Sequence, residues 1–134
     1  MPSDNFDTAC DRLSNAVDTV QFERLRWARH EGPMLARMIE LAQAAIEQRP
    51  DFELTEEGSS AANRRFVVKV HSNRVIAINL GLADGRATAS AEGIERARYR
   101  VEPGAPIVAE FDEVDAPWMT AALGELFSRV RPAA

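Results

Sequence analysis

The stretch RRFVVKVHSNRVIAINLGLADGRATAS, Arg64–Ser90, decides the fold of this chain. Apolar residues alternate with other residues along it, and a period of two places successive side chains on opposite faces of a β-strand. Asp84-Gly85 interrupts the alternation, and this dipeptide is a strong signal for a two-residue hairpin turn because both turn positions need positive φ. The stretch therefore predicts antiparallel strands, two of which are joined at Asp84-Gly85.

A turn centred on Asp84-Gly85 fixes the register of the two strands beside it. Large residues then face small ones on one side of the hairpin: Leu82 with Ala87, Leu80 with Ala89, and Ile78 with Ala91. On the other side Asn79 faces Ser90 and Gly81 faces Thr88. The turn chemistry and the hydrophobic pattern agree, which is typical of a well-specified register.

The preceding bend, HSNR, is less regular. A two-residue turn at Ser72-Asn73 would place Lys69 opposite Ile76 and mix the two faces. A three-residue loop, Ser72–Arg74, avoids this and places His71 opposite Val75 on the outer face. It predicts the pairs Val70 with Ile76, Val68 with Ile78, and Phe66 with Leu80.

The N-terminal third has a helical period instead. Apolar residues recur every seven positions at Phe6, Leu13, Val20 and Trp27, with Cys10 and Val17 between them. We expect a first helix, capped by Ser3 or Asp4, that ends at Glu31–Pro33. It either lies on a core, where it contacts two partners or bends near Val20, or forms a coiled-coil dimer. Cys10 is expected to be buried within the apolar row.

A second helix is predicted from Pro33 to Pro50, so that the first two helices form an αα-hairpin. A third is predicted from Asp115 and Pro117 onward. Between them, the segment Ala97–Asp112 predicts a hairpin centred on Gly104. It would pair Val101 with Ile107, Tyr99 with Ala109, Arg98 with Glu110, and Arg96 with Asp112.

These elements predict an α+β fold in one domain, residues 1–134. Residues 1–50 form the N-terminal αα-hairpin, residues 51–114 an antiparallel β-meander of five or six strands, and residues 115–131 the C-terminal helix. The helices are expected to pack on one sheet face.

Composition excludes several classes of function. The net charge of −5 opposes non-specific nucleic-acid binding, which needs a basic surface. No window approaches the roughly 20 apolar residues of a membrane helix, and the N-terminus is too polar for a signal peptide. With a single cysteine no internal disulfide forms, and a cytoplasmic location is expected.

No motif for catalysis, phosphate binding or metal binding is present. The two histidines, His30 and His71, have no paired cysteine or histidine at metal-ligand spacing. We therefore predict no metal, no cofactor and no catalytic residue, and the sequence favours a non-enzymatic protein.

The best candidate for a ligand or partner surface is basic. Arg96, Arg98 and Arg100 alternate, and in one strand they would project from one sheet face. With Lys69 and Arg86 they would offer a surface for a phosphate, a carboxylate or an acidic peptide. The candidate surface residues are Lys69, His71, Arg96, Arg98 and Arg100. The competing interpretation is that these arginines pair with carboxylates on the neighbouring strand.

Two functions are compatible with these patterns. The first is a protein–protein interaction or chaperone-like adaptor module that acts as a homodimer; the expected layout is similar in shape to secretion-chaperone-type proteins. The second is an enzyme or binding protein for an anionic or apolar small molecule, with a pocket between helices and sheet beside Ala87, Ala89 and Ala91.

Overall fold

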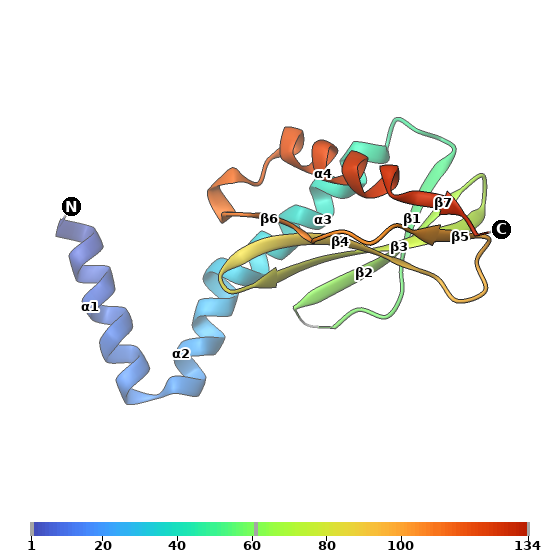
Figure 1. Cartoon of the computed structure of the whole chain (residues 1–134). Helices are drawn as coiled ribbons and strands as arrows, with labels where there is room; N and C mark the ends of the chain where they lie inside the picture. The colour runs from blue at the N-terminus through green and yellow to red at the C-terminus, as the bar shows by residue number, and fades with distance from the viewer. Residues whose placement is uncertain (1, 61, 134) are drawn as a thin grey trace. The chain divides into compact units, whose positions relative to one another are not determined.

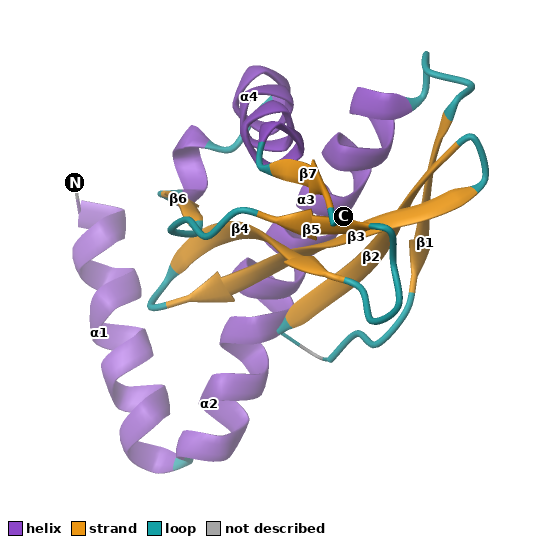
Figure 2. Ribbon diagram, turned by 45° about the vertical axis from the view of Figure 1, so that its right-hand side comes forward, coloured by secondary structure: helices purple, strands orange, loops and turns teal. Residues whose placement is uncertain are grey.

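The computed structural model describes residues 2–60 and 62–133 and divides into two compact units. The first, which we call the N-terminal unit, is Met1–Pro33, and the second, the sheet unit, is Met34–Ala134. The α+β fold with N-terminal helices, an antiparallel sheet and a C-terminal helix is confirmed (Figures 1 and 2). That the whole chain forms one domain stays a prediction.

The N-terminal unit contains α1 (Pro2–Val17), α2 (Thr19–Arg26) and a π-helical turn, η1 (Trp27–Glu31). The break between the N-terminal helices lies at Asp18, which has extended backbone angles and caps α2 by accepting a hydrogen bond from the Gln21 amide at 3.1 Å. The predicted break at Glu31–Pro33 is wrong. Gly32 has helical angles, and α3 (Gly32–Ile46) begins there.

The π-turn explains why Gly32 and Pro33 do not end the helix. The Gly32 amide donates to the Trp27 carbonyl, five residues back. A Cβ on Gly32 would lie only 3.1 Å from that oxygen and 3.2 Å from the indole Nε1, so glycine allows the close approach of Trp27. Proline next to it has no amide hydrogen to place in the widened turn.

The sheet unit is built on five strands in the order β1-β2-β3-β4-β6 (Figure 1). They are β1 (Phe52–Glu56), β2 (Asn63–Val70), β3 (Asn73–Ala83), β4 (Arg86–Gly93) and β6 (Ile107–Ala109). The strands β5 (Tyr99–Val101) and β7 (Val130–Pro132) form a separate pair. A short turn η2 (Phe111–Glu113) leads into α4 (Ala116–Ser128), which Asp115 caps by accepting from the Trp118 amide.

The hairpin of β3 and β4 has the predicted register. Leu82 pairs with Ala87, Leu80 with Ala89, Ile78 with Ala91, Asn79 with Ser90, and Gly81 with Thr88. Asp84 and Gly85 both have positive φ, 53° and 74°, as this type of turn requires. Here local turn chemistry and face alternation each specify the same arrangement.

The predicted register of β2 and β3 is wrong. The turn is made by His71 and Ser72, whose φ values are 50° and 65°. The observed pairs are Phe66 with Ile78, Val67 with Ala77, Val68 with Ile76, Lys69 with Arg74, and Val70 with Asn73. A bulge beside Lys69 leaves Val75 without a partner, and Val75 lines a groove with Val68 and Val70 instead of standing on the outer face. The bulge absorbs the residue that the two-residue turn would otherwise leave out of phase.

The predicted hairpin around Gly104 is also wrong. β5 pairs with β7 (Tyr99 with Pro132, Val101 with Val130), whereas β6 pairs with β4 (Ala87 with Ala109, Ala89 with Ile107). The loop between β5 and β6 is held by Arg129, which donates to the Ala105 carbonyl at 3.0 Å. Its guanidinium lies against Gly104, where an added Cβ would come within 2.7 Å of it. Two prolines in this loop cannot donate hydrogen bonds to a tight hairpin.

The core lies between the sheet and the helices α3 and α4, which Figure 1 shows on one side of the sheet. Its sheet side is formed by apolar residues of the central strands: Phe66, Val68, Ile76, Ile78, Leu80, Ala87 and Ala89. Its helix side is formed by Leu35, Met38, Ala42, Met119, Ala122, Leu123 and Leu126. Tyr99, expected to pair with Ala109, is 36% exposed because β5 lies outside the five-stranded sheet.

On the outer face of the sheet, apolar residues of the central strands are covered. Val67 and Ala77 are fully buried. Arg65 on β2 and Glu92 on β4 form an ion pair that crosses the intervening β3, and Glu92 stands beside Ala77 in the register. Val108 on β6 is 48% exposed.

Candidate functional site

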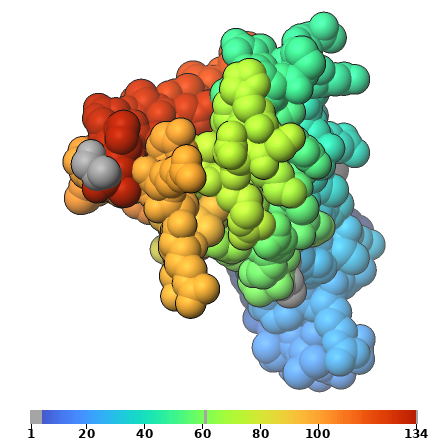
Figure 3. Space-filling view, turned by 90° about the vertical axis from the view of Figure 1, so that its right-hand side faces the viewer, coloured from blue at the N-terminus to red at the C-terminus, as the bar shows by residue number. Residues whose placement is uncertain are grey.

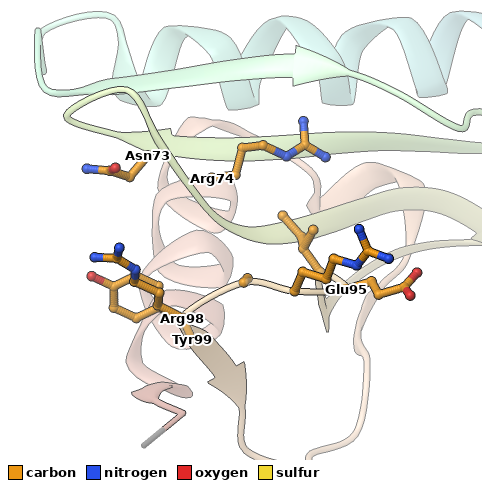
Figure 4. Close-up of a pocket in the computed structure, with 8 residues that line it drawn as sticks. Asn73, Arg74, Glu95, Arg98 and Tyr99 are labelled. Carbon is orange, nitrogen blue, oxygen red and sulfur yellow. The ribbon is translucent and has the colours of Figure 1, made fainter.

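A cavity of about 460 Å³ opens in the sheet unit between the start of β3 and the segment that leads from β4 to β5. Figure 4 shows Asn73 and Arg74 extending from β3 on one side, and Glu95, Arg98 and Tyr99 on the other. In Figure 3 the orange segment stands beside the yellow-green hairpin with a hollow between them. We call this the arginine cavity, and it is lined by Asn73, Arg74, Ile94, Glu95, Arg96, Ala97, Arg98 and Tyr99.

One wall of the arginine cavity is a turn with an unusual backbone. The Ala97 amide donates to the Ile94 carbonyl at 3.1 Å, which closes a four-residue turn. Its third residue, Arg96, has a φ of 66°, in the left-handed region where glycine is preferred. Beyond the turn, Ala133 donates its amide to the Arg98 carbonyl at 2.8 Å, next to the pairing of β5 with β7.

The other wall is fixed by the turn between β2 and β3. The His71 amide donates to the Asp51 carbonyl at 2.8 Å, and the Asn73 side-chain amide donates to the His71 carbonyl at 3.2 Å. Because the chain turns at His71-Ser72, Asn73 and Arg74 belong to β3 and reach the cavity.

The arginines of the cavity differ in their partners. Arg74 donates through Nη1 to Glu57 at 2.7 Å, and this hydrogen bond holds the pKa of Glu57 below its ordinary value. The side chains of Arg96 and Arg98 are exposed and form no ion pair or hydrogen bond with any residue in 2–60 and 62–133. The cavity therefore presents two guanidinium groups that the described part of the chain does not neutralise.

The structure brings together only part of the predicted basic surface. Arg96 and Arg98 line the cavity, but not as neighbours in one strand, because only Tyr99–Val101 is extended there. Arg100 pairs with Glu102 at 2.9 Å outside the cavity. Lys69 stands opposite Arg74 in the ladder, and His71 occupies the exposed turn.

The expected ion pairs of this surface are also corrected. Arg98 and Arg96 do not meet Glu110 and Asp112, since β5 and β6 are not paired. Glu110 pairs instead with Arg86, at 2.9 Å.

Six of the eight lining residues were not among the predicted site residues. Of these, Asn73 and Arg74 were expected in a loop, and Tyr99 in a hairpin strand opposite Ala109. Asn73 and Arg74 reach the cavity because the chain turns at His71-Ser72, both with positive φ. Histidine and serine indicate such a turn more weakly than Asn-Gly does, so the position of the turn was not recognised. The position of Tyr99 depends on the distant pairing of β5 with β7, for which the local sequence has no marker.

The predicted pocket beside the alanine residues of β4 is filled. Ala87 and Ala89 are fully buried, as are Met38 and Met119 on the helices. Two smaller apolar grooves, of about 200 and 170 Å³, are both lined by Phe52 and Phe127, whose rings are 5.7 Å apart. Both are below the roughly 300 Å³ of a typical small-molecule site.

The N-terminal unit carries an uncovered apolar row. On α1, Phe6, Leu13 and Val17 are 68%, 67% and 77% exposed, and Cys10 between them is exposed and not buried as predicted. We call these four residues the α1 stripe. The break at Asp18 places Val20 and Trp27 on other elements, so the predicted heptad repeat is limited to α1.

Searches for two other kinds of site gave no candidate. In residues 2–60 and 62–133 no group of three or more histidine, cysteine, aspartate or glutamate side chains could hold a metal ion. Among the helices of the same residues, none combines the length and apolar character needed to cross a membrane. Comparison with family models, curated proteins and solved structures finds no match to this chain.

Proposed function

We propose that this protein is a non-enzymatic interaction module that forms a homodimer, with the α1 stripe at the interface. The observation that carries the proposal is the exposure of the stripe, an apolar face that spans the whole of α1. Apolar surface of this kind on a helix indicates a binding partner, because burial of each such side chain stabilises by about 1.5 to 3 kcal/mol.

The N-terminal unit needs such a partner for its own stability. From residue 5 to residue 33 no side chain is buried. Helices of this length are marginal in water when isolated, and most helical stability in proteins comes from packing of an apolar face. Covering the α1 stripe would therefore order α1 as well as join the two copies.

The charges of the two helices favour a second copy as the partner. α1 carries three aspartates and one arginine, whereas the segment of α2 and η1 carries three arginines and two glutamates. Val20 and Leu25 on α2 are also exposed, at 60% and 43%. In a two-fold dimer, the acidic α1 of each copy would lie on the basic α2 of the other, with apolar residues between them.

Light scattering coupled to size-exclusion chromatography tests the proposal. Wild type is expected at twice the mass of the chain, and Leu13→Glu, which places a charge in the stripe, is expected at the monomer mass. Asn15→Glu is the matched control, because it adds the same charge to α1 on an exposed position away from the stripe. A monomeric wild type, or equal effects of the two variants, would contradict the proposal.

A further inference from the structure

We propose that the arginine cavity binds a small molecule through a phosphate monoester group, with Arg96 and Arg98 as the ligands of the phosphate. This inference is independent of dimer formation, since every lining residue belongs to the sheet unit.

Charge sets Arg96 and Arg98 apart from the other arginines of the sheet. In residues 51–60 and 62–114, five arginines each pair with a glutamate: Arg64, Arg65, Arg74, Arg86 and Arg100. Arg96 and Arg98 are the only arginines in those ranges that have no carboxylate partner, although the chain contains 21 acidic residues. Both residues line the same cavity, where a bound anion could supply the missing charge.

The number of unpaired charges favours phosphate over carboxylate. A phosphate monoester carries about −1.5 to −2 at neutral pH and offers three acceptor oxygens. It can therefore neutralise two guanidinium groups, whose planar donor forks bind phosphate oxygens in pairs. A single carboxylate would leave one arginine uncompensated.

The size and walls of the cavity favour an organic phosphate over the bare ion. Its volume of about 460 Å³ lies within the range of small-molecule sites, about 300 to 1,000 Å³. Tyr99, 36% exposed, offers an aromatic surface on the wall that also carries Arg98, and Asn73 offers an amide on the opposite wall (Figure 4). A ring or sugar attached to the phosphate would contact these groups.

The backbone at Arg96 is a second, independent observation. A non-glycine residue at a φ of 66° costs free energy, and the third position of this turn would be filled by glycine if stability alone mattered. Strained residues of this kind concentrate at binding sites. At Arg96 the left-handed conformation places a guanidinium at the cavity that glycine could not supply.

Isothermal titration calorimetry tests the inference with the full chain. The probes are adenosine 5′-monophosphate and inorganic phosphate, with adenosine and citrate as comparison compounds. Wild type is expected to bind the monophosphate, to bind inorganic phosphate more weakly, and to bind adenosine and citrate least. Arg96→Gln and Arg98→Gln are each expected to weaken binding of the monophosphate about tenfold, because each removes a charge-assisted pair.

Arg100→Gln is the matched control, because Arg100 lies in the same segment, is also exposed and does not line the cavity. The affinity of the Arg100→Gln variant for the monophosphate is expected to stay within about twofold of wild type, since distant surface charges are screened by salt. The unfolding midpoints of the three variants establish that each is folded.

Three results of the titrations would overturn the inference. They are no binding of either phosphate probe, an equal loss of affinity in Arg100→Gln, and tighter binding of citrate than of the monophosphate. Binding only to vesicles that contain phosphatidic acid would also overturn it, because a membrane surface would then be the source of the phosphate. The size-exclusion result on Leu13→Glu is separate, so the failure of one proposal does not decide the other.

Discussion

The N-terminal unit and the sheet unit show the same kind of apolar pattern with opposite outcomes. On β3, alternate residues such as Ile76, Ile78 and Leu80 are almost completely buried. On α1, the residues that recur at helical spacing are more than 60% exposed. Periodicity therefore predicts which side chains share a face, but it does not predict what covers that face.

This difference has a physical cause. A strand in a meander pairs with the strands next to it in sequence, because each follows after a two-residue turn. The helices of the same unit then cover one face of the sheet. α1 is joined to α2 through a single capping residue, Asp18, and within the N-terminal unit α2 has no buried side chain. An isolated helix of this length is marginal in water, because most helical stability in proteins comes from packing of an apolar face.

The largest expected effect separates the two regions directly. Leu80→Ala removes a fully buried side chain and is expected to lower the free energy of unfolding by about 2 to 5 kcal/mol. Leu13→Ala is expected to change it by less than about 0.5 kcal/mol at low protein concentration, because the side chain is exposed. Urea denaturation followed by circular dichroism measures both. Similar losses would mean that α1 is covered within one chain.

A smaller effect concerns pH and the edge of the sheet. Glu56 on β1 accepts hydrogen bonds from Arg64 and Ser59, which lower its pKa from 4.5 to about 2. A carboxyl whose pKa is lower in the folded state stabilises the protein above its unfolded pKa. That contribution is lost as the pH falls from about 4.5 to about 2.

Wild type should therefore lose more stability than Glu56→Gln across this range, in urea denaturation at a series of pH values. The comparison is specific to the sheet unit, because it follows the unfolding of the strands. Parallel curves for the two proteins would show that the ion pair contributes nothing measurable.

The cap between α1 and α2 should have a local effect. Asp18→Ala removes the acceptor for the Gln21 amide and is expected to cost about 1 kcal/mol of helix stability. Hydrogen exchange should become faster in residues 19–26 and stay unchanged in β3. Asp18→Asn, which keeps the acceptor, is expected to exchange at close to the wild-type rate; faster exchange in β3 would instead mean that the helix and the sheet unfold together.

The smallest effect is a gain. Ser72 has a φ of 65° in the turn between β2 and β3, where glycine is favoured. Ser72→Gly is expected to raise the free energy of unfolding by up to about 1 kcal/mol, measured by urea denaturation. The corresponding turn between β3 and β4 already has glycine, so Gly85→Ser is expected to lose stability by a similar amount. A gain from both substitutions would contradict this account of the turns.

The sequence was sufficient where two signals coincided. Asp84-Gly85 specified the turn and the alternation specified the faces, so the register of β3 and β4 was predicted pair by pair. At His71-Ser72 the turn signal was weak, and a bulge restored the alternation after the turn, so the face pattern alone led to the wrong register. Pairing of β5 with β7 joins residues about thirty positions apart and has no local marker.

The candidate site followed the same rule. Arg96 and Arg98 were identified by charge, which the sequence displays directly. Their arrangement in a cavity with Arg74 and Tyr99 depends on the turn at His71-Ser72 and on the departure of β5 from the sheet, neither of which was predicted.

The pairing of β5 with β7 makes the last strand a support for the arginine cavity. Arg98 accepts a backbone hydrogen bond from Ala133, and Tyr99 stands opposite Pro132, although neither Pro132 nor Ala133 lines the cavity. A bulky tag or a crosslink placed at β7 would therefore change the affinity for a ligand without touching it. It would disrupt the backbone pairing that holds Arg98 and Tyr99 in the wall of the cavity.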